Sequence, residues 1–265
     1  MAEDYALRLS PSELQRYAMM AEQARRSEAD LWAQAGLAAG AAVADIGCGP
    51  GALFSALVDA VTASGRVVGV DGDAEAVAAA QSLISAHGWP NVTVVRGDAD
   101  ASGLQPGAFD VVQLRHVLAH NGPAEQQIVD HAASLLRAGG HLYLLDAYAS
   151  GMAIRPTEPD FEDLNTTYLR YHAARGNDLE TGLRLRELAA GAGLEVIGYR
   201  GWYNIVTPPA GLEPPAWAAR DAMVRDGFAT HDDVQRWSAA LKRITALRPT
   251  VFASLFAAVA RRPGG

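Results

Sequence analysis

Three aspartates, each placed beside the end of an apolar run, are the side chains best positioned to do chemistry. Asp45 stands just before a glycine turn over residues 47–51. Asp71 ends the next apolar run, and Asp98 ends the third. Parallel strands bring their carboxyl ends to one edge of a sheet, so we expect these carboxylates to face one ligand. The pattern suits a cationic ligand that also carries hydroxyl and amino groups.

The glycine turn supplies the second half of this pattern. Glycines at positions 47, 49 and 51 let the backbone approach a ligand, and residues 52–60 have the apolar spacing of a helix. Gly47-x-Gly49-x-x-Ala52 also satisfies the dinucleotide fingerprint, which keeps an NAD(P)-dependent oxidoreductase as an alternative. Three carboxylates would repel a pyrophosphate but suit S-adenosylmethionine (SAM), which has a sulfonium, an ammonium, a ribose and an adenine. We therefore favour SAM.

Five motifs in order extend this interpretation to a family. They are Asp45-Ile-Gly-Cys-Gly-Pro-Gly51, Val68-Gly-Val-Asp71, Arg96-Gly-Asp-Ala99, Phe109-Asp-Val-Val-Gln-Leu114 and Leu136-Arg-Ala-Gly-Gly-His-Leu-Tyr-Leu-Leu145. Over residues from about 40 to 200 the chain resembles class I SAM-dependent methyltransferases, in the branch of ubiquinone/menaquinone-biosynthesis and natural-product enzymes. The resemblance implies a Rossmann-like, doubly wound α/β fold with a mostly parallel seven-stranded sheet, whose last strand is inserted antiparallel. It also implies S-adenosylhomocysteine as product.

The cofactor residues follow from the glycine turn and the resemblance together. We expect Asp45 near the ammonium, Asp71 at the ribose hydroxyls, Gly72 against the adenosine, and Asp98 with Ala99 at the adenine. Asp73 is the better helix cap, which leaves Asp71 for the ligand; Asp100 is close enough to exchange roles with Asp98. The other predicted cofactor contacts are Tyr17, Gln23, Gly47, Cys48, Gly49, Gly51, Gly97 and Arg115.

Two histidines follow the fourth predicted strand, where the transferred methyl group is expected. His116 or His120, with a pKa near neutral, would accept a proton from a hydroxyl during transfer, and His116 lies nearer the strand end. Packing of either ring in a short turn is the alternative. The aspartates would raise the pKa of Cys48, so we expect a turn residue and no covalent mechanism. Gln113-Leu-Arg-His116 replaces the Asn/Asp-Pro-Pro-Tyr motif of amine-directed enzymes, which argues against nucleic acid as substrate.

Aromatic residues in the second half are candidates for an acceptor pocket. We predict that Tyr148, Tyr168, Tyr171 and His172 hold a flat or prenyl-like acceptor, with core packing as the alternative. Asp146 ends the fifth strand, where one branch of methyltransferases binds magnesium. The partner Asp and Asn residues of such a site cannot be placed, so no metal is predicted. O- or C-methylation is slightly favoured over N-methylation.

Alternating strands and helices must position these residues. We predict strands near 43–47, 67–71, 92–96, 109–114, 140–146, 194–203 and 251–260, with helices near 10–36, 52–62, 73–87 and 124–138. The resemblance implies that residues 1–40 form an N-terminal helical lid on a domain of residues 41–265; an amphipathic helix packed on the sheet is the alternative for residues 10–36. Cap insertions are expected at 149–180 and 204–248, with helices near 161–175, 216–226 and 231–246.

Composition limits the partners. The chain has 265 residues, a net charge of −8 and one cysteine. The acidic balance disfavours a polyanionic partner, and the single cysteine excludes an intrachain disulfide framework and fits the cytoplasm. The first residues lack a signal-peptide pattern, and no apolar run reaches membrane-spanning length. We expect a small-molecule partner, neither nucleic acid nor membrane, with a homodimer left open. A SAM-binding protein without transfer activity is the second alternative.

Overall fold

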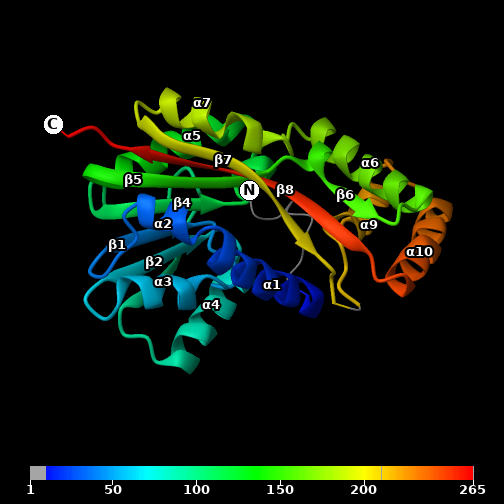
Figure 1. Cartoon of the computed structure of the whole chain (residues 1–265), viewed down its shortest axis with the longest axis horizontal. Helices are drawn as coiled ribbons and strands as arrows, with labels where there is room; N and C mark the ends of the chain where they lie inside the picture. Colours follow the sequence, from blue (N-terminus) through cyan, green and yellow to red (C-terminus); the bar gives the residue numbers. More distant parts are fainter. Residues whose placement is uncertain (1–9, 210, 265) are drawn as a thin grey trace.

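A computed structural model of the chain describes residues 10–209 and 211–264, and the predicted lid residues 1–9 lie outside them. One mixed sheet organises the molecule, in the order β3-β2-β1-β4-β5-β8-β6, with β7 paired to the other edge of β8. Helices cover both faces of this sheet, and a second group of helices lies beyond one end of it (Figure 1). The predicted α/β class is confirmed.

Five parallel strands form the half of the sheet that carries the glycine turn. Each is rich in Val, Ile and Leu because both faces of a parallel sheet are buried. Their bounds are Ala42–Ile46 (β1), Arg66–Asp71 (β2), Val92–Arg96 (β3), Phe109–Arg115 (β4) and Leu136–Ala147 (β5). The parallel pairing puts the ends of β1, β2, β4 and β5 at one edge, as the sequence predicts.

Three antiparallel pairings complete the sheet. Strand β8 (Thr250–Arg261) runs antiparallel to both β5 and β7 (Glu195–Val206), which confirms the inserted last strand. An eighth strand, β6 (Ala153–Arg155), pairs with the start of β8 and was not predicted. Three residues are too few for a period-2 pattern to be read from the sequence.

Two groups of helices flank the sheet. The α3 helix (Phe54–Val61) and α4 helix (Ala74–His87) share one apolar core with α1 and α2, while α5 (Glu125–Leu135) and α7 (Leu185–Gly191) pack on the opposite face. Alternate residues of each strand belong to the two cores; in β1, Val43 faces the first and Ala44 the second. The alternation follows from the two-residue period of a strand.

The N-terminal segment forms two helices instead of one. The α1 helix (Pro11–Ser27) begins at Ser10, whose hydroxyl accepts the Glu13 N–H at 3.2 Å, and Pro11 occupies the first turn as predicted. The chain turns at Glu28, and α2 (Ala29–Gln34) follows. The break was not predicted because the residues around position 28 are compatible with a continuous helix.

A separate apolar core joins the cap helices. Its elements are α6 (Pro159–Ala174), α8 (Pro215–Ala218), α9 (Arg220–Arg225) and α10 (His231–Ala246). The predicted helix over 216–226 is split at Ala219, which caps α8 and precedes α9. Figure 1 shows α6, α9 and α10 gathered at the end of the molecule where β6 and the start of β8 lie. Among the described helices, none has the length and apolar character needed to cross a membrane.

Candidate functional site

A large cavity lies where the carboxyl ends of the parallel strands meet α1 and the cap. Its volume is about 1950 Å³, against about 300–1,000 Å³ for ordinary ligand pockets. Its walls come from the ends of β1, β2, β4 and β5, from α1, and from α6, α10 and β8. The cavity therefore has room for more than one small molecule.

The glycine turn at the end of β1 has a backbone that favours glycine throughout. Gly47, Gly49 and Gly51 have φ angles of +73°, +55° and +79°. A Cβ at Gly47 would lie 2.4 Å from the Val117 side chain, so no larger residue fits there without movement. At Gly49 a Cβ would lie 3.4 Å from the Tyr17 ring, which shows that α1 covers this turn.

Asp71 and Asp73 divide their roles as the sequence suggests. Asp73 caps α4, because its carboxylate accepts the Glu75 N–H at 2.7 Å. Asp71 instead accepts the Gly49 N–H at 2.8 Å and the Asp73 N–H at 2.9 Å, and it lines the cavity. Each carboxylate oxygen retains a second lone pair for a ligand.

Asp45 is a deeply buried carboxylate of the cavity wall, with 3% of its surface exposed. Burial raises its pKa to about 6, partly offset by the Gln113 amide and the Arg115 guanidinium. Burial, with the charges of Asp45 and Asp71, raises the pKa of the Cys48 thiol, which agrees with the expectation of an unreactive turn residue.

Most of the predicted residues come together in this cavity. The lining includes Tyr17, Gln23, Asp45, Gly47, Cys48, Gly49, Asp71, Gly72, Gly97, Asp98, Ala99, Arg115, His116, His120, Tyr168 and His172. Gln23 is oriented by Asn204, whose amide donates to its side-chain oxygen at 3.2 Å. Asp100 does not line the cavity and accepts the Gln127 amide at 3.0 Å, so Asp98 is the better adenine candidate.

Three predicted residues lie outside the lining. Gly51 shapes the turn and packs under Phe54, without facing the cavity. Tyr171 is buried in the cap core, where its ring meets Phe228 and its hydroxyl donates to Asp226 at 3.4 Å. Tyr148 packs edge-on against Phe256. The structure therefore does not bring these two tyrosines into the cavity lining, and their contact with an acceptor stays a prediction.

Arg115 is held by an acid that sequence reasoning missed. Glu28, fully buried at the α1–α2 break, accepts from Arg115 Nε at 2.9 Å and Nη2 at 2.6 Å. The Tyr143 hydroxyl donates to the same carboxylate at 2.8 Å. A signal was present, since Glu28 shares the helical spacing of the buried Ala21, Ala24 and Leu31.

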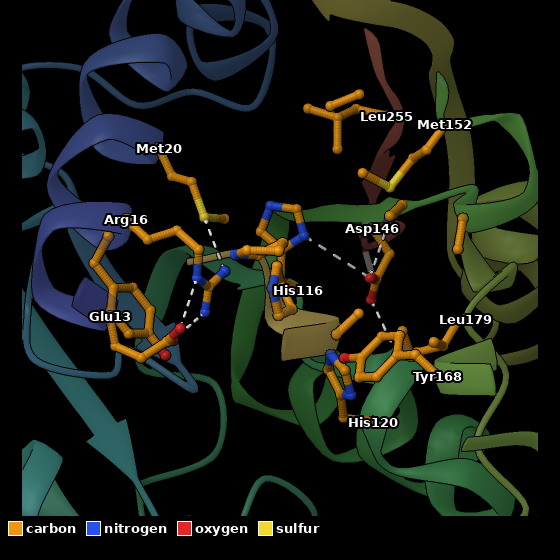
Figure 2. A pocket seen from close by; sticks show the side chains of 18 of the residues that line it. Glu13, Arg16, Met20, His116, His120, Asp146, Met152, Tyr168, Leu179 and Leu255 are labelled. Carbon is orange, nitrogen blue, oxygen red and sulfur yellow. Dashed lines mark hydrogen bonds and ion pairs between the residues drawn. The ribbon is translucent and has the colours of Figure 1, made fainter. Parts of the chain in front are cut away.

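His116 stands at the end of β4 in an unusual backbone conformation. Its φ is +58°, and its N–H donates to the Leu145 carbonyl at 2.9 Å, so strand pairing continues to this residue. Non-glycine residues in this region are strained, and such strain is concentrated at functional sites. The imidazole Nδ1 lies 4.0 Å from Asp146 Oδ1, and the side chain remains 25% exposed. Figure 2 shows the ring between α1 and Asp146.

Asp146, at the end of β5, has an environment that favours its neutral form. Burial raises its pKa to about 7, although it accepts the backbone N–H groups of Ala119 and Ala147, both at 3.1 Å. The charge of Glu125 also raises the pKa. Asp146 is therefore poised to change protonation near neutral pH. The sequence pattern does not indicate this behaviour, because burial of the Asp146 side chain cannot be read from it.

The histidines are neutral in this cavity, contrary to the expected near-neutral pKa. Burial, Arg115 and Arg16 lower the pKa of His116 well below its usual value, and burial lowers that of His120 to about 3. His172, also buried, has its pKa lowered to about 4. Its ring meets the Tyr168 and His120 rings edge-on, with centroids 4.4 and 5.1 Å away. Neither His116 nor His120 alone is a strong base.

The α1 helix also contributes a charged pair that was not predicted. Arg16 donates from Nε to Glu13 at 3.1 Å and from Nη1 to the Met20 sulfur at 3.4 Å. Glu13 is 3% exposed, and Figure 2 shows Arg16 reaching from α1 toward His116. The charge of Arg16 contributes to the lowered pKa values of His116 and His120. Within residues 10–209 and 211–264, no cluster of His, Cys, Asp and Glu suits a metal ion.

Comparison with known proteins agrees with this geometry. A family described as methyltransferase domain matches residues 43–140. The chain is 35% identical to an arsenite methyltransferase of Aquipseudomonas alcaligenes over 42% of this chain and 34% of that protein. It is 28% identical to a demethylmenaquinone methyltransferase of Shouchella clausii over 53% of this chain and 57% of that protein. The chain thus spans about a third of the first relative and just over half of the second.

Solved structures share the fold at low sequence identity. A SAM-dependent methyltransferase from Aquifex aeolicus has a TM-score of 0.56 and 15% identity, covering 96% of this chain and 100% of that chain. The cyclase SpnF has a TM-score of 0.55 and 19% identity, and the match covers 89% of this chain and 80% of SpnF. The glycine turn and the carboxylates agree with the domain match, and residues 43–140 are similar to the methyltransferase domain family.

Proposed function

We propose that this protein transfers the methyl group of SAM to an oxygen or carbon atom of a small organic acceptor. One observation carries the proposal: a single cavity joins Asp45, Asp71 and Asp98 to the pair of His116 and Asp146. The first group suits a cationic adenosyl donor, and the second suits removal of a proton from the acceptor. In-line displacement at the sulfonium methyl would then yield S-adenosylhomocysteine.

The part of the cavity that holds Asp45, Asp71 and Asp98, which we call the donor end, favours SAM over a dinucleotide. In a dinucleotide site, backbone N–H groups of the glycine turn point at the pyrophosphate. Here the Gly49 N–H donates to the Asp71 carboxylate, which places a negative charge where the pyrophosphate would lie. Asp45 would attract the donor's ammonium, Asp71 would accept its ribose hydroxyls, and Asp98 would accept its adenine amino group.

The part of the cavity that holds His116 and Asp146, which we call the acceptor end, favours methylation of a hydroxyl group or an acidic carbon atom. A proton leaving the acceptor would move to His116 Nε2, while Nδ1–H faces Asp146 and the resulting imidazolium is stabilised by that carboxylate. The 4.0 Å separation exceeds a hydrogen bond and would have to shorten in the loaded site. Once the separation shortens, an ionised Asp146 would offset the lowered basicity of His116, because an adjacent negative charge favours the protonated ring.

The acceptor we propose is organic and not arsenite, although one relative is an arsenite methyltransferase. Soft, thiophilic ions are bound by thiolates, and this sequence has a single cysteine. Cys48 lies in the glycine turn with a raised pKa, so it is poorly suited to supply one. The quinone-directed relative supports an aromatic, hydroxylated acceptor of biosynthetic origin.

Replacement of Asp71 tests the donor site. Asp71→Ala should weaken SAM binding by about 1.5–3 kcal/mol, because charge-assisted hydrogen bonds to the ribose are lost. Isothermal titration with SAM measures the change, and titration with NADH tests the dinucleotide alternative. Asp100→Ala is the matched control, since Asp100 carries the same charge outside the cavity. Equal affinity in wild type and Asp71→Ala would remove Asp71 from the donor site.

The acidity of Asp45 predicts a pH dependence of donor binding. Its pKa is about 6, so the carboxylate that would pair with the donor's ammonium becomes neutral as the pH falls through that value. SAM affinity should then decrease with falling pH, by up to about tenfold per pH unit. Titrations between neutral and mildly acid pH measure the slope, and Asp45→Asn should flatten it. An affinity that increases on acidification would contradict this role of Asp45.

A SAM-binding protein without methyl transfer remains the second candidate. The fold shared with the [4+2]-cyclase SpnF favours it, because that protein has the same architecture and is named for a different reaction. The two candidates differ in products. Formation of S-adenosylhomocysteine with a quinol or phenol panel supports transfer; tight SAM binding with no turnover on any acceptor supports the alternative.

A further inference from the structure

The cavity wall contributed by the cap is largely apolar. We call this part the acceptor chamber and define it by Met152, Ile154, Phe161, Leu241, Ile244 and Val251, which all line the cavity. Phe161 and Ile244 are buried members of the cap core, and Ile154 and Leu241 pack on it. A chamber of this kind binds an apolar body by removing it from water.

Two arginines stand at the outer end of this chamber. Arg155 ends β6 and lies opposite Thr250 in the ladder between β6 and β8. Arg248 precedes that partner by two residues. Both side chains line the cavity and are exposed. Arg248 also has a φ of +49°, so two of the three described non-glycine residues with positive φ, His116 and Arg248, belong to the cavity wall.

Nearby acids do not neutralise these arginines. Glu158 and Asp160, at the start of α6, form ion pairs with Arg243 and Arg236 of α10. Glu162 and Glu213 also line the cavity, yet among the described residues no carboxylate lies within ion-pair distance of Arg155 or Arg248. Arg155 donates to the backbone carbonyl of Ile154 at 2.8 Å. In a chain of net charge −8, two exposed arginines of one cavity wall that form no ion pair with any described carboxylate are unusual.

We propose that the acceptor is an amphipathic acid, whose apolar body fills the acceptor chamber and whose anionic group binds Arg155 and Arg248 at its outer end. The inference rests on the proposed function and names its class of substrate. Arginine matches the geometry of carboxylate and phosphate oxygens, so either anion satisfies the site. Anchoring the acid at the mouth leaves the opposite end of the molecule to approach His116.

Two dyes of similar shape and different charge test this proposal without knowledge of the acceptor. Anilinonaphthalene sulfonate carries an anion, and N-phenylnaphthylamine is the neutral counterpart. Fluorescence titration of Arg155→Gln and Arg248→Gln should show about threefold weaker sulfonate binding for each variant and about tenfold for the double variant. The neutral dye should bind all variants equally. Arg170→Gln is the matched control, because Arg170 is an exposed α6 arginine outside the cavity.

Competition identifies the anion. Displacement of the neutral dye by dodecanoate indicates a carboxylate, and stronger displacement by dodecyl phosphate indicates a phosphate. The proposal would be overturned if dodecanol displaced the neutral dye as well as dodecanoate or dodecyl phosphate does. It would also be overturned if the sulfonate dye did not bind, or bound the double variant as tightly as the wild type. Equal losses of affinity for the two dyes would overturn it too. Titration of every variant with S-adenosylhomocysteine distinguishes failure of this inference from failure of the proposed function. If S-adenosylhomocysteine binds but the dyes do not behave as expected, only this inference is overturned. If S-adenosylhomocysteine does not bind, the proposed function is overturned.

Discussion

Asp146→Asn should lower kcat by about a hundredfold or more, which is the usual contribution of general acid–base catalysis. The amide keeps the size of the side chain but cannot stabilise a positive charge on His116. SAM affinity should stay within about twofold, because Asp146 lies at the acceptor end of the cavity. Steady-state formation of S-adenosylhomocysteine measures kcat, and calorimetry measures donor affinity.

The pH profile separates a catalytic effect from a merely structural one. His116, whose pKa is well below its usual value, stays neutral, while Asp146 ionises at about pH 7. The wild-type rate should therefore rise with pH through about 7, and Asp146→Asn should lose this rise. Burial is the main cause of both shifts; the charges of Arg115 of β4 and Arg16 of α1 also lower the pKa of His116, and the charge of Glu125 also raises that of Asp146. Unchanged turnover in Asp146→Asn would contradict the role.

His116 provides the matched comparison. If His116 and Asp146 act as one unit, His116→Gln should cost about as much in kcat as Asp146→Asn, and the double variant little more than either. Additive losses would show independent roles. Thermal unfolding of each variant controls for the backbone N–H groups of Ala119 and Ala147, which Asp146 satisfies in the folded protein.

Glu28→Ala should produce the largest loss of stability, about 3–5 kcal/mol in the free energy of unfolding. Removing this carboxylate leaves Arg115 charged, with only 9% of its side chain exposed, and leaves the buried Tyr143 hydroxyl without its acceptor. Denaturant unfolding followed by circular dichroism measures the change. Donor affinity should decrease as well, because Arg115 lines the cavity beside Asp45.

Glu22→Ala is the control for this prediction. Glu22 pairs with Arg26 in the same helix, but the two side chains are 56% and 78% exposed. Exposed pairs contribute about 0–1 kcal/mol, so this variant should unfold almost as the wild type does. Similar losses for Glu22→Ala and Glu28→Ala would mean that helix propensity, and not the buried ion pair, determines the effect.

The strands and the donor end were predictable because both depend on local patterns. Continuous runs of Val, Ile and Leu identify buried strands, and parallel topology then brings the residues after them to one edge. Asp45, Asp71 and Asp98 accordingly line one cavity. The Asp73 cap was predictable for the same reason, since a capping side chain acts within three residues of its own position.

The acceptor end was less predictable because its properties arise from contacts distant in sequence. Glu28 and Arg115 are separated by 87 positions, and nothing near either residue names the other. The pKa values of His116 and Asp146 follow from burial, which a sequence does not specify. Tyr148 and Tyr171 do not line the cavity, and the sequence could not indicate this because an aromatic ring has the same pattern in a core as in a binding site.

The course of β8 sets how the two ends of the molecule can move. This strand pairs with β6 near the cap and continues as the neighbour of β5 and β7 in the middle of the sheet. A continuous ladder of this kind cannot hinge without breaking several hydrogen bonds at once, so the chamber is expected to keep its dimensions throughout turnover. Ligands would then enter and leave by movement of α1. Acceptors would be selected by a chamber of fixed shape, which does not adapt to each molecule.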